Sequence, residues 1–308
     1  LVPPDRFIGI AEDTGLIVRG EKRESSGGRP ASFIQPVFDA AYSIGVHITA
    51  GRVCMALTDL APNVLCAETY NLLWRNEDGY WTDLTALLSE FVSQQVVDTS
   101  KILGVGVAFD ALFSHESATT TALDWGANET IDLKKVGAAF PYPVLFNNAA
   151  KMAGYAQSWG GMEQADLVYL TLDDTITGAI VIAREELHFT SKNAAFGHMP
   201  VPGNRQVCRC GNIGCLDSMC SIHAVTERSG LSLEDFFSTD MDRDSSHSRL
   251  FKEYMDGLAF VIHSLRIVFD LDIVMGGRMS RYLAQHLPHV RSLLEKMNPF
   301  RESGAYAR

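Results

Sequence analysis

The alternation of apolar and polar residues predicts that the chain begins its folded part with three strands. Strand-like runs occur at 41–49, 53–60 and 64–72, and short turns containing Gly51 and Pro62 separate them. Short turns join antiparallel neighbours, so this pattern predicts a meander. The next elements are predicted to alternate: a helix at 81–97, a strand at 102–109, a helix at 132–139, a strand at 143–147 and a helix at 149–158.

The second half of the chain repeats this alternation. Strands are predicted at 167–172, 178–183 and 272–277, and helices at 222–230, 233–238, 247–269 and about 279–297. The helix at 247–269 carries its large apolar residues on one stripe, as expected of a helix that packs on a core. Strands and helices that alternate in both halves predict an α/β protein made of two similar parts.

Composition and charge narrow the class of protein. The chain has 308 residues, 46% hydrophobic and 20% charged, which predicts a globular protein of about two domains. The net charge of −11 excludes nucleic-acid binding by bulk charge. Residues 1–30 carry equal numbers of acidic and basic side chains, so the negative charge belongs to 31–308. A separate N-terminal DNA-contacting module and a simple solvated turn explain this difference equally well.

The N-terminal residues and the hydropathy of the chain predict where in the cell the protein is located. No apolar stretch is long enough to span a membrane, and no secretory signal precedes the first strand, so we expect a cytoplasmic protein without a membrane partner. The chain starts at Leu1 rather than Met. We therefore expect it to begin inside a longer gene product, or to lack its true start.

A cluster of thiols predicts a metal site. Cys208, Cys210 and Cys215 lie within eight residues, and His198 is ten residues upstream of the first. Without an export signal, such a cluster favours metal over disulfides, although free thiols or a local disulfide are the alternatives. His198 is the natural fourth ligand and Cys220 its competitor. Four protein ligands close a tetrahedral site, so we predict structural zinc.

The same residues carry a family resemblance. Gly197-His198, followed by Cys-x-Cys-Gly-x-x-Gly-Cys and an acidic residue, resembles the signature of the ROK family of repressors, open reading frames and sugar kinases. The resemblance covers roughly residues 15–280. It implies a two-lobed actin-like, hexokinase-like (ribonuclease H-like) ATPase fold that binds a sugar between its lobes. Family kinases also use ATP and magnesium.

Three departures from the family kinases imply loss of catalysis. The kinases' first strand ends in Asp-x-Gly-Gly-Thr, but residues 47–52 contain no carboxylate. Their phosphate-binding Gly-Thr-Gly-x-Gly turn is replaced by residues 173–177, where Asp173 and Asp174 are expected to repel phosphates. Their Asn-Asp pair is Asn147-Asn148 here, and an amide cannot act as the general base. We therefore expect no catalytic residues, no ATP or Mg²⁺, and no enzyme activity.

Loss of catalysis with an intact zinc signature implies the family's regulator branch. Gly15-Leu16-Ile17 and Gly28-Arg29-Pro30 resemble the segments around the wing of these regulators, and residues 25–30 read as a linker or wing. Residues 1–35 are thus predicted as the remnant of a winged helix-turn-helix with its linker, 36–150 as the first lobe, and 151–308 as the second lobe with a zinc-binding loop at 196–220. The implied partners are a DNA operator, a sugar-like effector and further copies of the chain, as a homodimer or homotetramer.

Four polar residues are candidates for effector binding. Asn147, Asn148, His198 and Asp217 could line a polar cleft for a polyol, or could be structural polar groups around an emptied site. The family's sugar-binding Glu is Ala195 here, which implies a weaker or different ligand than glucose. One alternative function is a sugar kinase with altered motifs, similar to glucokinase or an N-acetylhexosamine kinase. Another is a non-catalytic scaffold with no role on DNA.

Overall fold

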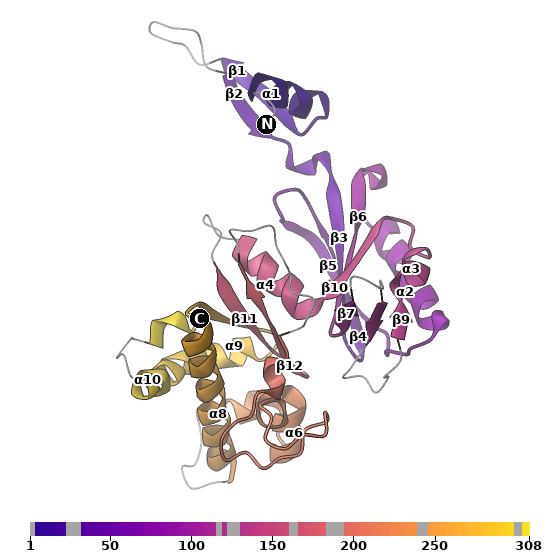
Figure 1. The fold of residues 1–308 in the computed structure, drawn as a ribbon. Helices are drawn as coiled ribbons and strands as arrows, with labels where there is room; N and C mark the ends of the chain where they lie inside the picture. Colours follow the sequence, from indigo (N-terminus) through magenta and orange to yellow (C-terminus); the bar gives the residue numbers. More distant parts are fainter. Residues whose placement is uncertain are drawn as a thin grey trace, which may run out of the picture. The chain divides into compact units, whose positions relative to one another are not determined.

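A computed structural model describes residues 4–22, 32–114, 119–121, 130–159, 166–182, 194–238, 246–298 and 304–308 (Figure 1). Contacts within the chain divide it into two units. The first unit comprises residues 1–109 and 131–147, and the second comprises residues 110–130 and 148–308. No helix among the described residues has both the length and the apolar character needed to cross a membrane.

One helix and one hairpin precede the first sheet. Helix α1 (Pro4–Asp13) is followed by β1 (Ile17–Lys22), which pairs antiparallel with β2 (Ser32–Pro36). The Arg19–Glu12 ion pair, at 2.8 Å, joins the hairpin to α1. A winged helix-turn-helix is not evident in the described residues up to 36, because that motif needs at least two packed helices and only α1 is present. The predicted linker or wing at 25–30 lies outside the described residues.

A five-stranded sheet forms the centre of the first unit. Its strand order is β10-β6-β3-β4-β5. Strands β3 (Tyr42–Ile48), β4 (Arg52–Thr58) and β5 (Val64–Asn71) form the predicted antiparallel meander, and β6 (Ile102–Phe109) runs parallel to β3. Strand β10 (Val144–Asn148) completes the sheet. The short elements of the first unit are η1 (Phe38–Ala40), η2 (Thr99–Lys101) and α3 (Leu133–Gly137). Strands β7 (Leu112–Ser114) and β8 (Thr119–Thr121) belong to the second unit, and β9 (Thr130–Asp132) begins at its last residue before the chain returns to the first unit.

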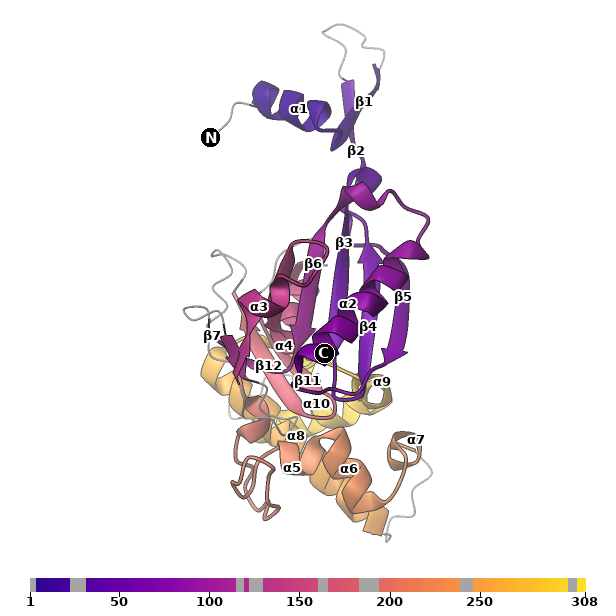
Figure 2. The same cartoon turned by 90° about the vertical axis from the view of Figure 1, so that its right-hand side faces the viewer.

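Helix α2 (Asp78–Ser93) covers one face of this sheet (Figure 2). The burial of β3 alternates strictly, so Ile44, Val46 and Ile48 all point to one face. Trp81 of α2 packs edge-on against Phe109 of β6, with ring centroids 6.3 Å apart. Alternate apolar side chains of β3 and the apolar side chains on one face of α2 are therefore buried in the same layer.

The second unit is built on a three-stranded sheet of order β12-β11-β13. Strand β11 (Leu167–Leu172) pairs antiparallel with β12 (Ile176–Val181) and parallel with β13 (Asp272–Gly276). Helix α4 (Ala149–Trp159) packs on β11 and β12, and the long helix α8 (Ser246–Phe269) contributes the largest share of the core. The smaller elements are η3 (Phe196–His198), α5 (Asp217–Cys220), α6 (Ile222–Ser229), α7 (Leu233–Phe236) and η5 (Gly304–Tyr306).

The last predicted helix is broken into three pieces. Instead of one helix over 279–297, the chain forms α9 (Ser280–Leu283), η4 (Ala284–His286) and α10 (Leu287–Met297). Proline lies in the first turn of α10, at Pro288. Proline has no N–H to donate to the preceding turn, but it fits the start of a helix. The chain therefore starts a new helix at this point.

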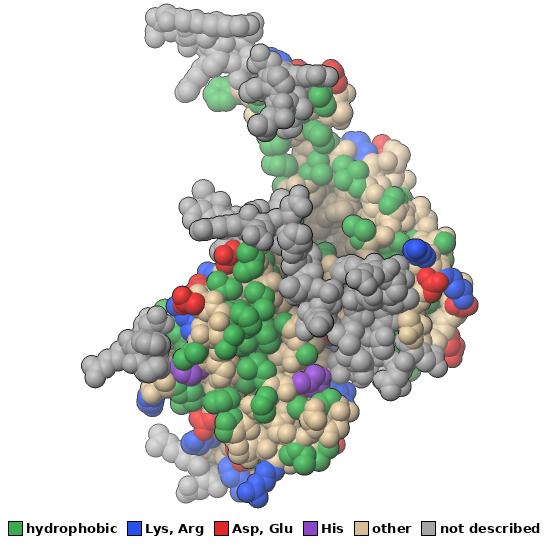
Figure 3. Space-filling model, in the orientation of Figure 1, with side chains coloured by type: hydrophobic (Ala, Val, Ile, Leu, Met, Phe, Trp, Pro, Cys, Tyr) green, Lys and Arg blue, Asp and Glu red, His purple; other side chains and the backbone are tan. Residues whose placement is uncertain are grey.

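Hydrophobic side chains also remain on the surface of the second unit. Figure 3 shows them gathered in a band over this unit. Among the described residues of the unit, five large apolar ones are more than 40% exposed: Ile182, Val207, Ile213, Ile267 and Val268. Val207 and Ile213 face one another across an isolated bridge in the loop that carries the cysteines. Single exposed apolar side chains are common on protein surfaces, whereas a contiguous apolar patch is typical of a surface that contacts another molecule.

Candidate functional site

The cysteine-rich loop is a tight hairpin that turns its thiols toward one another. The backbone N of Cys208 donates to Asn212 O at 2.7 Å, and Gly211 N donates to Cys208 O at 2.8 Å. Gly211 and Gly214 have φ values of +90° and +93°, which glycine adopts without steric cost. The loop is anchored at its base, where Pro200 bridges Cys215. The two glycines thus permit the turns that bring the cysteines together.

The four predicted metal ligands form one cluster. The ligand atoms of His198, Cys208, Cys210 and Cys215 all lie within 4.8 Å of one another. His198 Nδ1 is 3.7 Å from Cys208 Sγ, and the Sγ atoms of Cys210 and Cys215 are also 3.7 Å apart. A tetrahedral ion with Zn–S bonds of about 2.3 Å requires sulfur–sulfur separations of about 3.8 Å. The donor set and its dimensions are therefore consistent with a zinc site.

The pKa values of Cys208 and Cys210 are shifted in opposite directions. Burial raises the pKa of Cys208 to about 12. At Cys210 burial also acts to raise the pKa, but hydrogen bonds from the Asn212 backbone and from the neighbouring thiols outweigh it, and the pKa is lowered. A metal binds thiolates rather than thiols, so zinc would have to displace the proton of Cys208.

Cys220 does not belong to the cluster. Its side chain is completely buried, and its Sγ donates to the carbonyl oxygen of Tyr254 at 3.5 Å. Burial raises the pKa of this thiol well above its usual range. The geometry thus favours His198 over Cys220 as the fourth ligand.

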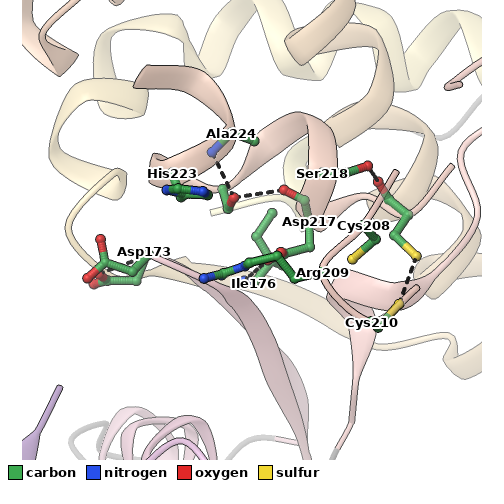
Figure 4. Close-up of polar contacts among 12 residues, drawn as sticks. Asp173, Ile176, Cys208, Arg209, Cys210, Asp217, Ser218, His223 and Ala224 are labelled. Carbon is green, nitrogen blue, oxygen red and sulfur yellow. Dashed lines mark hydrogen bonds and ion pairs between the residues drawn. The ribbon is translucent and has the colours of Figure 1, made fainter. Parts of the chain in front are cut away.

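Asp217 joins the cysteine-rich loop to the sheet. It begins α5 two residues after Cys215, and its side chain is only 8% exposed. Asp217 Oδ1 accepts a hydrogen bond from Ile176 N at 2.7 Å, at the start of β12 (Figure 4). Arg209 Nη2 lies 3.9 Å from Asp217 Oδ2. One carboxylate oxygen is therefore committed to the backbone, and the other faces an arginine of the loop.

Asn148 occupies a buried position at the start of α4. It is 1% exposed, its Nδ2 donates to Ala111 O at 3.4 Å, and its Oδ1 accepts from Lys151 N at 3.2 Å. Asn147 is assigned to the first unit, whereas Asn148, His198 and Asp217 belong to the second. Within the second unit, the structure brings His198 and Asp217 onto one loop and its flanking helix.

The sequence patterns did not point to two charged residues, Lys151 and Arg278, that the structure places at notable positions. Lys151 is 3% exposed, and burial lowers its pKa. Its place three residues after Asn148, as the one polar side chain within the run 149–154, was the available signal. Arg278 follows the glycine pair of β13 and contacts both Asp173 and Asp174. Arg278 thus partly neutralises the charge of the two carboxylates that the sequence predicts to repel phosphates.

The amino-acid sequence of the chain matches that of a known protein family. Residues 43–303 match the model of the ROK family. The chain belongs to the ROK family. It is 26% identical over 220 residues to a putative xylose repressor of Caldicellulosiruptor sp. (strain Rt8B.4), an alignment that covers 68% of this chain and 54% of that protein. The chain therefore spans about half the length of this relative.

Solved structures of ROK proteins share the fold. A ROK family transcriptional regulator, a homologue of the E. coli MLC protein, superposes with a TM-score of 0.79 at 18% identity, covering 99% of this chain and 82% of its own. A ROK family glucokinase from Streptomyces griseus, solved with glucose and AMPPNP, gives a TM-score of 0.67 at 19% identity and covers 85% and 92% of the two chains. The chain thus has the two-lobed α/β ROK fold, which regulators and kinases share.

Proposed function

We propose that this chain is the effector-sensing body of a ROK-type transcriptional repressor, and that it transfers no phosphoryl group. A sugar or related small molecule would bind the body and control how an N-terminal module binds its DNA operator. The observation that carries this proposal is the amide at Asn148, where the family kinases have their catalytic carboxylate.

The surroundings of Asn148 support a structural use of this side chain. An amide oxygen is too weak a base to take a proton from a sugar hydroxyl. Its Oδ1 already accepts from the Lys151 backbone, and its Nδ2 donates to Ala111. Lys151, whose backbone N makes this contact, is itself buried, and burial lowers the pKa of its side chain. These contacts fit a site that binds without catalysing.

Two features support the proposed regulator role: the N-terminal helix and hairpin, and the similarity to known regulators. Helix α1 and the β1–β2 hairpin come directly before the first sheet, and a matching regulator structure aligns with 99% of this chain. We propose residues 1–35 as the end of the DNA-binding module and its linker, 36–150 as the first lobe, and 151–308 as the second. The residues at 196–220 would form a structural zinc loop within the second lobe, held by His198, Cys208, Cys210 and Cys215.

Effector binding is proposed at Asn147, Asn148, His198 and Asp217. Their amide, imidazole and carboxylate groups have the donors and acceptors that a polyol requires. A similar protein is called a putative xylose repressor, so pentoses belong in the first ligand panel together with hexoses. Self-association as a homodimer or homotetramer is supported by the exposed apolar residues of the second unit, such as Ile267 and Val268.

The first experiment addresses DNA and effector together. The genomic sequence upstream of Leu1 should encode a helix-turn-helix shortly before Gly15. A gel-shift assay of the complete gene product on its own upstream region should show a complex that one sugar of the panel dissolves. A sequence without such a motif, or a protein that binds no DNA under any ligand, would reject the regulator function.

An active sugar kinase is the second candidate, because a ROK glucokinase shares the fold. ATP-dependent phosphorylation of a pentose and hexose panel distinguishes the two candidates. Turnover above that of a no-enzyme control would favour the kinase. A ligand that raises the melting temperature without being phosphorylated would favour the sensor.

A further inference from the structure

One face of helix α8 lines a groove on the surface of the second unit. The lining residues recur every three or four positions, so they lie on one side of the helix: Ser246, Arg249, Glu253, Asp256 and Phe260. At 1.5 Å per residue this stripe is about 21 Å long. The loop at 201–206 and the end of α6 line the groove from the other side. We call this feature the α8 groove.

The α8 groove consists of two adjoining hollows. The first, of about 650 Å³, lies between the loop at 201–206 and α8, and the second, of about 470 Å³, lies between the end of α6 and the start of α8. Gln206 and Arg228 line both hollows. Arg228 Nη2 lies 2.6 Å from Glu253 Oε2, which joins α6 to α8 (Figure 1). An extended peptide advances about 3.3 Å per residue, so the groove has room for about six residues of one.

Apolar side chains are contiguous along the groove and beside it. Both hollows have such side chains in their lining: Val201, Met219, Leu231, Leu250 and Phe260. Val207 directly follows Gln206 of the lining and is 71% exposed. Ile213, 66% exposed, faces Val207 across the bridge of the cysteine hairpin. A contiguous apolar surface of this kind is typical of a site that contacts another molecule.

The charged residues of the groove leave an excess of cations. Its two acidic residues already form ion pairs: Glu253 with Arg228 and Asp256 with Lys252. Arg205 and Arg249 are exposed, and neither forms an ion pair with another described residue. The chain as a whole carries a net charge of −11, so the groove is locally opposite in sign to the rest of the protein. Charge complementarity across an interface therefore favours an acidic partner.

We propose that the α8 groove, with Val207 and Ile213 beside it, is a docking surface for an acidic segment of a partner protein. The segment would lie extended along α8, place carboxylates near Arg205 and Arg249, and place apolar side chains in the two hollows. A nucleic acid fits less well, because Glu253 and Asp256 would repel its phosphates. Copies of one chain commonly meet over broader faces than a groove of this length. Docking here is independent of whether the chain senses a sugar.

Selection of peptides on the intact chain tests the proposal without assuming a partner sequence. Random peptides displayed on phage would be selected on the wild type, resynthesised with a fluorophore and titrated by fluorescence anisotropy. We expect the selected peptides to carry more acidic than basic residues, together with apolar ones. Their binding should weaken severalfold when salt is raised from about 50 to about 300 mM, because salt screens exposed charges.

Charge reversal in the groove should weaken this binding. Arg205→Glu/Arg249→Glu should raise the Kd of the selected peptides by about tenfold or more, because it removes the complementary charge. Lys134→Glu/Lys296→Glu is the matched control, since it makes the same charge change at exposed lysines that do not line the groove. The control should change the Kd by less than about twofold.

Removal of the exposed apolar pair provides a second test. Val207→Ser/Ile213→Ser should raise the Kd about fivefold, whereas Ile267→Ser/Val268→Ser, an equally apolar and exposed pair elsewhere, should leave it unchanged. Thermal denaturation would show that each variant is folded. If the hairpin variant is not, the charge-reversal pair decides the outcome.

Several results would overturn the proposal. Among them are a selection that enriches no peptide or only basic ones, and peptides that bind the charge-reversal variant as tightly as the wild type. Sedimentation that shows an oligomer dissociated by the same variant, with no selected peptide bound to the wild type, would assign the groove to a second copy of the chain. Binding of double-stranded DNA that this variant abolishes would assign it to nucleic acid.

Discussion

The carboxylate of Asp217 accepts a hydrogen bond from the backbone N of Ile176 at 2.7 Å, across 41 positions of sequence. This bond joins the end of the cysteine-rich loop to the first residue of β12. The loop and the turn at 173–177 are therefore mechanically connected. We therefore expect a ligand or metal that orders one of them to restrain the other.

Replacing Asp217 with Ala should lower the free energy of unfolding by about 1–3 kcal/mol, because the buried N–H of Ile176 would lose its acceptor. Urea denaturation monitored by circular dichroism would measure the change. Asp256→Ala is the matched control, since Asp256 forms an exposed pair with Lys252 on α8 and should cost well under 1 kcal/mol. Equal effects of the two variants would contradict a structural role for the Asp217 bond.

Substituting Cys210 with Ser should release zinc and unfold the cysteine hairpin within the loop at 196–220, because thiolate–zinc bonds hold this hairpin, whose apolar side chains Val207 and Ile213 are exposed. Metal analysis of the purified protein should find one zinc per chain in the wild type and little in the variant. Cys54→Ser is the matched control, since Cys54 is exposed and lies on β4. Retention of zinc in Cys210→Ser, or its loss in Cys220→Ser but not in His198→Ala, would show that the ligand set is different.

Restoring a carboxylate at position 148 should not restore catalysis. A general base is worth about 10²–10⁴-fold in rate, whereas positioning and charge neutralisation of the phosphates supply most of the acceleration in phosphoryl transfer. We expect no measurable sugar kinase activity from the wild type or from Asn148→Asp, and no rise in melting temperature with ATP. Clear stabilisation of the wild type by ATP would reinstate the kinase function.

The ion pair between Asp173 and Arg278 should make stability depend on pH in the acid range. The pKa of Asp173 is lowered in the folded protein from its ordinary value of 3.8. Its contribution is therefore complete above about pH 4 and is lost as the pH falls through the lowered pKa. The stability difference between wild type and Asp173→Asn should be constant from pH 5 to 7 and shrink below pH 4. A difference that grows on acidification would contradict this assignment.

Local patterns predicted the elements better than the contacts between them. The alternation in β3 identified a half-buried strand, and the spacing around Cys208 identified a metal cluster, because both signals lie within a few residues. The break before α10 was missed, since the apolar pattern of 279–297 continues across Pro288. Helix α1 was also missed, because among its residues 8–13, whose burial the structure describes, only Ala11 is buried.

The pairing of Asp173 with Arg278 lay beyond prediction for a different reason. The two residues are 105 positions apart, and only the parallel register of β11 and β13 brings them together. Nothing local in either turn encodes that register. The same holds for Asp217, whose side chain could be placed near the cysteines from sequence but not against Ile176.

The long connection between β11 and β13 also shapes how the second unit folds. The meander of the first unit closes through turns of a few residues, whereas β13 must find β11 after a connection that contains β12, the cysteine-rich loop and α8. Closing so long a loop costs entropy and slows folding. A metal ion bound by both His198 and Cys215 would cross-link the chain and so shorten the flexible part of that connection. Bound zinc would then accelerate refolding, because β13 would pair with β11 sooner.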